Sequence, residues 1–386
     1  MAWVEAGKKN MAAKAEAAVR EMAEGATFVS LFNAGIGDEG TAKIAEELGK
    51  NATVEYLDLA DNQITDEGAA NLAGALGDNT TLETLGLGSN QITDEGAANL
   101  AGALGDNTTL KELYLFDNQI ADEGAANLAG MLRVNTTLKT LYLYNNQITD
   151  EGAANLAGAL GDNTTLKELR LDSNQITDEG AANLAGALGD NTTLKTLRLG
   201  SNQITDEGAA NLAGALRWNT TLKKLWLDGN QITDEGAAQL LEELCANTTL
   251  TFLDLDDNPM SDAAKQAVLD LVKQNKEDPA AAQARAEAAA GAVAVPPAEA
   301  PLAGGAAAAG AAAGSAAGAA AAAPALGAGA AAVAVMAAAP PAAPAALAAG
   351  GGAAAAAGSS GGAAAGSSSS SSSSSFSGEE DDDANA

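Results

Sequence analysis

The side chains that ordinarily carry out catalysis are scarce in this chain. Its 386 residues include no histidine, so the usual general base and the commonest transition-metal ligand are missing. Cys245 is the only cysteine, which excludes an internal disulfide, and we expect a buried structural thiol. The acidic residues Asp254, Asp256 and Asp257 lack the glycine and the terminal glutamate of a calcium-binding loop. The sequence therefore predicts that the chain is not an enzyme and holds no cofactor or metal.

Noncovalent recognition is the chemistry for which the chain is better equipped. Only 3% of its residues are aromatic, yet several of them, with two arginines, recur at intervals of 2 and 28 residues. The set consists of Tyr114, Phe116, Tyr142, Tyr144, Arg170, Arg198 and Trp226. Tyrosine, tryptophan and arginine provide large contact areas and bidentate hydrogen bonds at protein interfaces. We predict that these seven residues bind a partner; the alternative is that the aromatic residues merely suit strands and cover a sheet.

The spacing of this set follows a repeat that runs through the chain. Shifting the sequence by 28 residues superimposes it on itself, as one column of leucines illustrates: Leu82, Leu110, Leu138, Leu166, Leu194, Leu222 and Leu250. Leu113 and Leu115 alternate with Tyr114 and Phe116, as a strand with one buried face requires. Apolar residues then follow at helical spacing, so each repeat is predicted to be a strand, a turn and a helix.

Each repeat reads L-x-x-L-x-L-x-x-N-x-I, for example from Leu82 through Asn90 to Ile92, and an apolar helix follows. This pattern resembles the leucine-rich repeat, specifically the subtype of ribonuclease inhibitor, the NOD-like receptors and Ran GTPase-activating protein. The resemblance implies an α/β solenoid, a horseshoe with a parallel sheet on its concave face and helices on its convex face. A NOD-like receptor would also need a nucleotide-binding domain, and the sequence has no phosphate-binding loop of the required type.

Polar columns are expected to hold the repeats together. One asparagine follows each strand, where its amide can satisfy backbone groups that water cannot reach: Asn62, Asn90, Asn118, Asn146, Asn174, Asn202, Asn230 and Asn258. A second asparagine opens each Asn-Thr-Thr triplet, from Asn79 to Asn247, and we interpret it as structural rather than as a glycosylation acceptor. Thr93 precedes Asp94 and Glu95 and is predicted to cap the helix that they begin.

The composition divides the chain into three parts. Residues 1–25 are predicted to form a capping helix and, because they lack a long apolar core, not a signal peptide. Residues 26–277 contain about nine repeats of 28 residues. Residues 278–386 are rich in Ala, Gly, Pro and Ser and end in acidic residues, so we expect a disordered tail. Its prolines interrupt any helix, and we expect no segment to cross a membrane.

The formal net charge of −31 makes nucleic acid and anionic membranes poor partners. A row of lysines precedes the outward strand positions: Lys111, Lys139, Lys167, Lys195 and Lys223. We expect this row to be a solvated edge that can steer an acidic partner toward the two arginines.

Together these features predict a monomeric, cytoplasmic scaffold that binds another protein on the concave sheet. The partner would bring apolar anchors for the tyrosines and carboxylates for Arg170 and Arg198. The resemblance to Ran GTPase-activating protein gives an alternative, a regulator of a small GTPase. No residue known for that activity can be matched to a position in this chain.

Overall fold

The computed structural model describes the backbone of residues 2–293 and the side chains of residues 12–289. Nine short strands form one parallel sheet in the order of the sequence. The strands are β1 (Phe28–Ser30), β2 (Tyr56–Asp58), β3 (Thr84–Gly86), β4 (Glu112–Tyr114), β5 (Thr140–Tyr142), β6 (Glu168–Arg170), β7 (Thr196–Arg198), β8 (Lys224–Trp226) and β9 (Phe252–Asp254). Each strand pairs with the next at an offset of one repeat, as Leu113 with Leu141.

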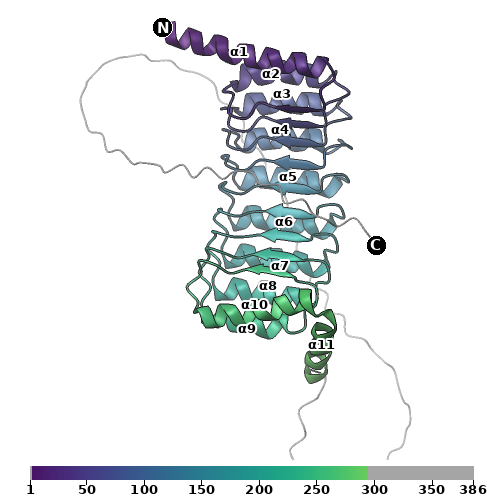
Figure 1. Cartoon of the computed structure of the whole chain (residues 1–386), viewed down its shortest axis with the longest axis vertical. Helices are drawn as coiled ribbons and strands as arrows, with labels where there is room; N and C mark the ends of the chain where they lie inside the picture. The colour runs from purple at the N-terminus through teal and green to yellow at the C-terminus, as the bar shows by residue number, and fades with distance from the viewer. Residues whose placement is uncertain (1, 294–386) are drawn as a thin grey trace, which may run out of the picture. The chain divides into compact units, whose positions relative to one another are not determined.

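A helix follows every strand and packs against the helices of neighbouring repeats. The helices are α1 (Ala2–Ala23), α2 (Gly37–Leu48), α3 (Asp66–Leu76), α4 (Asp94–Leu104), α5 (Asp122–Val134), α6 (Asp150–Asp162), α7 (Asp178–Asp190), α8 (Asp206–Leu216), α9 (Asp234–Leu244), α10 (Asp262–Glu277) and α11 (Pro279–Val293). Figure 1 shows the strands in one layer and α2 to α9 in a second layer behind it. The fold is the predicted α/β repeat solenoid, and none of the helices within residues 2–293 lies over the other face of the sheet, which we call the open face.

The core lies between these two layers. Leu113 and Leu115 of the fourth repeat are fully buried, whereas Tyr114 and Phe116 remain partly exposed. The equivalent leucines from the second repeat to the ninth are buried as well, whereas Leu31 of the first repeat is only partly buried. This alternation confirms the prediction of inward leucines and outward variable residues, and each repeat buries its apolar face only because a neighbour covers it.

The asparagines after the strands form the predicted ladder. In the fifth repeat the Asn146 amide donates to the carbonyl oxygens of Leu115 (3.0 Å) and Leu143 (3.1 Å), and its oxygen accepts from the Ile120 amide (3.1 Å). The asparagines of the Asn-Thr-Thr triplets are buried as well, and Asn107 bonds to the carbonyl of Leu76 in the previous repeat (2.9 Å). Both columns therefore have the structural role that the sequence predicted.

A third ladder, made by aspartates, was not predicted. Thr93 does cap α4, but its own amide and hydroxyl donate to the Asp66 carboxylate of the previous repeat, at 2.8 and 2.7 Å. The Gly96 amide donates to the same carboxylate at 2.9 Å. A methyl group on Gly96 would lie 2.5 Å from Asp66 Oδ1 and 2.8 Å from Ile92 Cγ2. The Asp66 carboxylate therefore caps the helix of the next repeat together with Thr93, and Gly96 leaves room for it.

Helices α1 and α10 cover the two ends of the stack, in agreement with the predicted caps (Figure 1). The prediction that residues 278–386 are disordered is wrong for its first part, because Pro279–Val293 form α11. Arg285 of this helix donates to the carbonyl oxygens of Cys245 and Asn247, both at 3.1 Å, and to Asn275 Oδ1 at 2.6 Å. The composition of this segment gives no sign of the attachment, because it depends on a single arginine among alanines, which bonds to two backbone carbonyls at the end of the stack.

The structure also bears on the predictions for the cysteine and for a membrane-spanning segment. Cys245 is a free cysteine and is only partly buried, so the prediction of a buried thiol is wrong. It directly follows the end of α9, and its carbonyl accepts a hydrogen bond from Arg285 of α11. Within residues 2–293 no helix is long and apolar enough to cross a membrane. The predictions for residues 294–386, including the acidic end, concern residues outside those that the structure describes.

Candidate functional site

The open face of the sheet presents three columns of outward side chains, because alternate strand residues point away from the helices. The first column runs from Phe28 to Phe252 and the second from Ser30 to Asp254, each with a step of 28 residues. The third lies two residues further on, from Phe32 to Asp256. These columns hold most of the differences between otherwise similar repeats, and the candidate site therefore consists of residues from them.

Four aromatic rings stack in pairs across β4 and β5. The ring centroids of Tyr114 and Tyr142 are 4.7 Å apart, and those of Phe116 and Tyr144 are 4.6 Å apart with planes only 4° from parallel. Tyr142 and Tyr144 are 6.3 Å apart and join the two stacks. The spacing is that of neighbouring strands, about 4.8 Å, so the backbone itself sets the stacking distance. On the β3 side the Phe116 ring lies over Gly88, where any side chain would collide with it.

Two arginines continue this surface across β6 and β7. The Arg170 guanidinium lies 4.5 Å from the Tyr142 ring centroid and 5.0 Å from that of Tyr144. The Arg198 guanidinium lies 4.6 Å from the Trp226 ring on β8. We call the seven residues Tyr114, Phe116, Tyr142, Tyr144, Arg170, Arg198 and Trp226 the strand-face strip. The structure brings all seven together on one face, in a row that crosses five strands.

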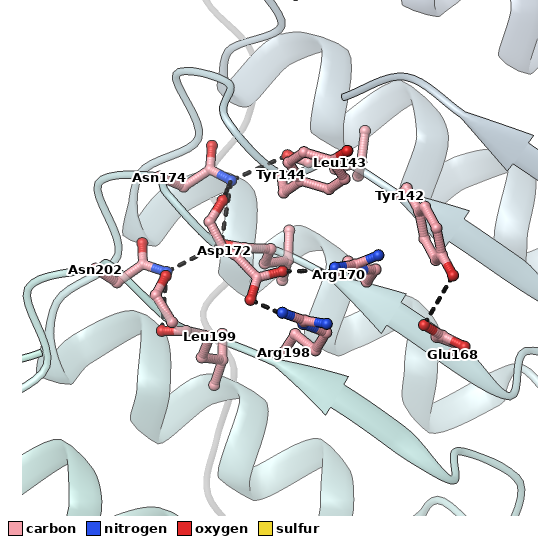
Figure 2. Close-up of polar contacts among 12 residues, drawn as sticks. Tyr142, Leu143, Tyr144, Glu168, Arg170, Asp172, Asn174, Arg198, Leu199 and Asn202 are labelled. Atoms are coloured by element: carbon pink, nitrogen blue, oxygen red, sulfur yellow. Dashed lines mark hydrogen bonds and ion pairs between the residues drawn. The ribbon is translucent and has the colours of Figure 1, made fainter. Parts of the chain in front are cut away.

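Asp172 links the two arginines, as Figure 2 shows. Its carboxylate oxygens lie 3.1 Å from Arg198 Nε and 3.7 Å from Arg170 Nε, and its side chain is only 13% exposed. The sequence had suggested that partner carboxylates would pair with both arginines, but each already shares an internal carboxylate. The remaining guanidinium nitrogens are the ones left for a partner, and Asp172 and the rings hold them in place.

Glutamates of the first outward column hold two of the tyrosine hydroxyls. Tyr142 donates to Glu168 at 3.0 Å (Figure 2), and Tyr114 donates to Glu112. Burial, and then the charge of Glu168, raise the pKa of Tyr142 to about 12. Burial raises the pKa of Tyr144 to about 12 as well, against the opposing effect of Arg170. These phenols therefore stay neutral donors at any physiological pH.

Sequence reasoning missed the first outward column. Phe252 packs against Trp226 with ring centroids 4.6 Å apart, and Glu112 and Glu168 of the same column accept from the tyrosines. A second aromatic pair, Phe28 and Tyr56, stacks at 4.5 Å on β1 and β2. The signal was present in the sequence, because residues two positions before the tyrosine column have the same outward orientation.

The charge of the open face changes toward its last strands. Asp228 lies two residues after Trp226, in the third column. Asp254 ends β9, and Asp256 follows it in the third column. Burial and then the charge of Asp254 raise the pKa of the Asp228 carboxyl. Among the described residues no three or more Cys, Asp or Glu side chains come together as metal ligands would. The open face therefore offers aromatic edges, guanidinium groups and acids, which are groups for binding another molecule.

A sequence profile described as TMOD/LMOD leucine-rich domain matches residues 27–126, 99–183, 118–209 and 174–277, which together span the whole repeat region. The chain belongs to this leucine-rich-repeat family. The match agrees with the fold and with the predicted leucine-rich repeats, but it does not confirm the ribonuclease-inhibitor-like subtype. It also gives no support to the alternative of a small-GTPase regulator.

The chain is also similar to two solved structures at low identity. Leiomodin-1 actin-binding site 2 is 22% identical, with a TM-score of 0.33 over 49% of this chain and 95% of the other. The tropomodulin C-terminal domain of Caenorhabditis elegans is 18% identical, with a TM-score of 0.34 over 38% of this chain and 90% of the other. No curated protein sequence matches this chain.

Proposed function

We propose that the protein is a non-enzymatic scaffold that binds a partner protein on the open face of its sheet, with the strand-face strip as the centre of the interface. The observation that carries this proposal is the continuous row of stacked rings and guanidinium groups from Tyr114 to Trp226. Residues of these types dominate the binding energy of protein interfaces.

Preorganisation supports the proposal. Stacking, ion pairing to Asp172 and hydrogen bonds to Glu168 fix the side chains of the strip before any partner arrives. Immobilising a flexible side chain on binding costs about 0.5–1.5 kcal/mol, and much of that cost is already met here. The internal contacts alone do not explain this arrangement, because β2 and β3 carry Asp58, Ala60, Gly86 and Gly88 at the equivalent positions and form the same sheet.

The chemistry of the strip also suggests the partner. The rings are stacked face to face and present their edges, so they suit aliphatic and aromatic side chains that insert against them. The outer guanidinium nitrogens of Arg170 and Arg198 suit backbone carbonyls or carboxylates. We therefore propose a partner segment with apolar anchors next to hydrogen-bond acceptors.

Capture from a cell extract, quantified by mass spectrometry, tests the proposal. The strip variant combines Tyr142→Asp and Tyr144→Ala, which copies Asp58 and Ala60 of the second repeat and so keeps residues that this fold already accepts there. We expect the proteins captured by the natural chain to fall at least tenfold with the strip variant, while its unfolding midpoint changes little.

A matched control alters the other side of the molecule. Val134 and Trp218 are 63% and 75% exposed and replace the aspartate of other repeats. Val134→Asp with Trp218→Asp restores the repeat and removes exposed apolar surface. We expect this control to retain the captured proteins. If the control loses them and the strip variant keeps them, the binding face has been assigned wrongly.

Actin is the first defined protein to test, because one of the similar structures is an actin-binding site of leiomodin-1. Titration of labelled monomeric actin and cosedimentation with filaments would both be measured with the natural chain and the strip variant. Actin is the partner if binding occurs and the strip variant weakens it. Equal binding by the natural chain and the strip variant would place actin elsewhere on the molecule.

A further inference from the structure

A groove runs along the edge of the sheet, beside the first outward column. It has a volume of about 390 Å³ and is lined by three successive copies of the same Thr-Thr-Leu-Lys turn. In the first copy the lining residues are Thr108, Thr109 and Lys111, and the next two copies contribute the equivalent residues up to Lys167. The turns that lead from the helices into β4, β5 and β6 therefore form a trough with hydroxyl and ammonium groups in its wall.

The lysine column is not a regular part of the repeat. It reads Glu55 and Glu83 before β2 and β3, then becomes lysine at Lys111 and stays lysine through Lys223. Lys111 pairs with Glu83, but Lys139, Lys167, Lys195 and Lys223 make no ion pair with any residue that the structure describes. These four are all exposed, in a chain whose net charge is −31.

Such a row favours a ligand with many negative charges. Neighbouring strands are about 4.8 Å apart, so the five lysines from Lys111 to Lys223 span about 19 Å, and an extended segment of about six residues covers that length. Like charges held this close repel one another, and an acidic segment in the groove would relieve the repulsion. The threonine hydroxyls can donate to its carboxylates or backbone carbonyls.

We propose that this groove, together with Lys195 and Lys223, which continue the lysine row beyond it, binds an extended acidic segment of the partner protein. The inference rests on the proposed function, because the groove lies beside the strand-face strip and one partner would cover both. A protein segment fits better than a single-stranded nucleic acid. Tyr114 and Tyr142, like Phe116 and Tyr144, stack on each other, so the ring faces on which bases would stack are already occupied.

A fluorescent peptide of about ten glutamates, long enough to span the row in extended form, tests the groove separately from the strip. Its binding to the full chain would be followed by anisotropy at low and at moderate salt. We expect binding that weakens as salt increases. Lys139→Glu, Lys167→Glu and Lys195→Glu in one variant should lower the affinity at least tenfold. The corresponding triple glutamine variant, which adds no negative charge, should also weaken binding.

The matched control places the same three charge reversals on the C-terminal cap, at Lys265, Lys273 and Lys276. Because the net charge changes equally, this variant should bind within about twofold of the natural chain if the groove itself is the site. The strip variant should bind the peptide normally, so failure of the groove and failure of the strip give different results. Equal losses in the cap and groove variants would overturn the proposal. Tighter groove-dependent binding of a single-stranded oligonucleotide of the same charge would overturn it as well.

Discussion

The turn-and-helix side of this molecule and the open face of its sheet were built from the same repeat, yet they differ in how far they tolerate change. On the first side the ladder asparagine, the aspartate at the helix start and the glycine after it recur in almost every repeat, because each forms hydrogen bonds or close contacts with a neighbouring repeat. On the second, the same positions hold glycine in β3, tyrosine in β4 and β5, and arginine in β6 and β7. On the first side repetition marks what the fold requires, whereas variation on the open face marks positions that the fold does not fix.

The largest effect is expected in the ladder, where Asn146→Ala removes a buried amide. Its loss leaves the Ile120 amide without a partner and removes one of the two asparagine donors from each of the Leu115 and Leu143 carbonyls, so the free energy of unfolding should fall by about 3 kcal/mol. Urea denaturation followed by circular dichroism measures this change. Asn127→Ala, on the exposed surface of α5, should cost less than about 0.5 kcal/mol. Equal costs would contradict the structural role of the ladder.

Two glycines sharpen the same contrast within one helix. Gly96→Ala should destabilise the fold by about 2 kcal/mol, because the new methyl group would lie 2.5 Å from Asp66 Oδ1. Gly102→Ala meets nothing within 4 Å and should stabilise α4 by about 1 kcal/mol. Thermal melts of both variants test this contrast: the melting temperature should fall for Gly96→Ala and rise for Gly102→Ala. A neutral Gly96→Ala would mean that the aspartate ladder does not need that space.

On the open face, alkaline titration reports whether the strip is formed. All 4 tyrosines have a pKa raised above the ordinary value of 10.0, two of them to about 12. Between these values the folded state keeps protons that the unfolded state has lost. The contribution of these raised pKa values to the free energy of unfolding is therefore fully present below about pH 10 and decreases as the pH rises toward 12. Tyrosinate absorbance should show little ionisation of the folded chain near pH 10, and normal ionisation in urea; normal titration of the folded chain would contradict the packed rings.

A smaller effect is expected at the one strand-to-helix turn among those of α3 to α9 that lacks a threonine. Ala121 precedes α5 and offers no side-chain cap, although its amide still donates to Asp94 at 2.7 Å. Ala121→Thr introduces a hydroxyl that can donate to Asp94, as the equivalent Thr93 hydroxyl donates to Asp66. The substitution should raise the free energy of unfolding by about 1 kcal/mol. The melting temperature measures the gain, and no gain would mean that the hydroxyl adds nothing to the ladder.

The sequence was sufficient for the fold because its signals are local and repeated. The alternation of Leu113 and Leu115 with Tyr114 and Phe116 predicted which side chains face outward, and the structure confirms it. The aspartate ladder could not be read in the same way, since a residue at a helix start already has an explanation as a cap of its own helix.

The site was predictable only in part. The equal spacing of the strip residues predicted that they lie together, but the pairing of Arg170 and Arg198 with Asp172 depends on side-chain geometry that spacing does not contain. Helix α11 was not predicted for a related reason. Its attachment depends on what Arg285 meets at the end of the stack, and the composition of residues 279–293 gives no sign of that contact.

Photocrosslinking from two positions tests the central claim most directly, without weakening the interface. A photoreactive phenylalanine derivative at Thr140, which lies between Glu112 and Glu168 in the first outward column, would report on the open face. The same group at Gly186 of α7, where nothing lies within 4 Å, would report on the helix side. We predict that the captured partner becomes crosslinked from position 140 and not from position 186. Crosslinks from position 186 alone would show that the invariant side of the repeat is the binding face and would contradict this account.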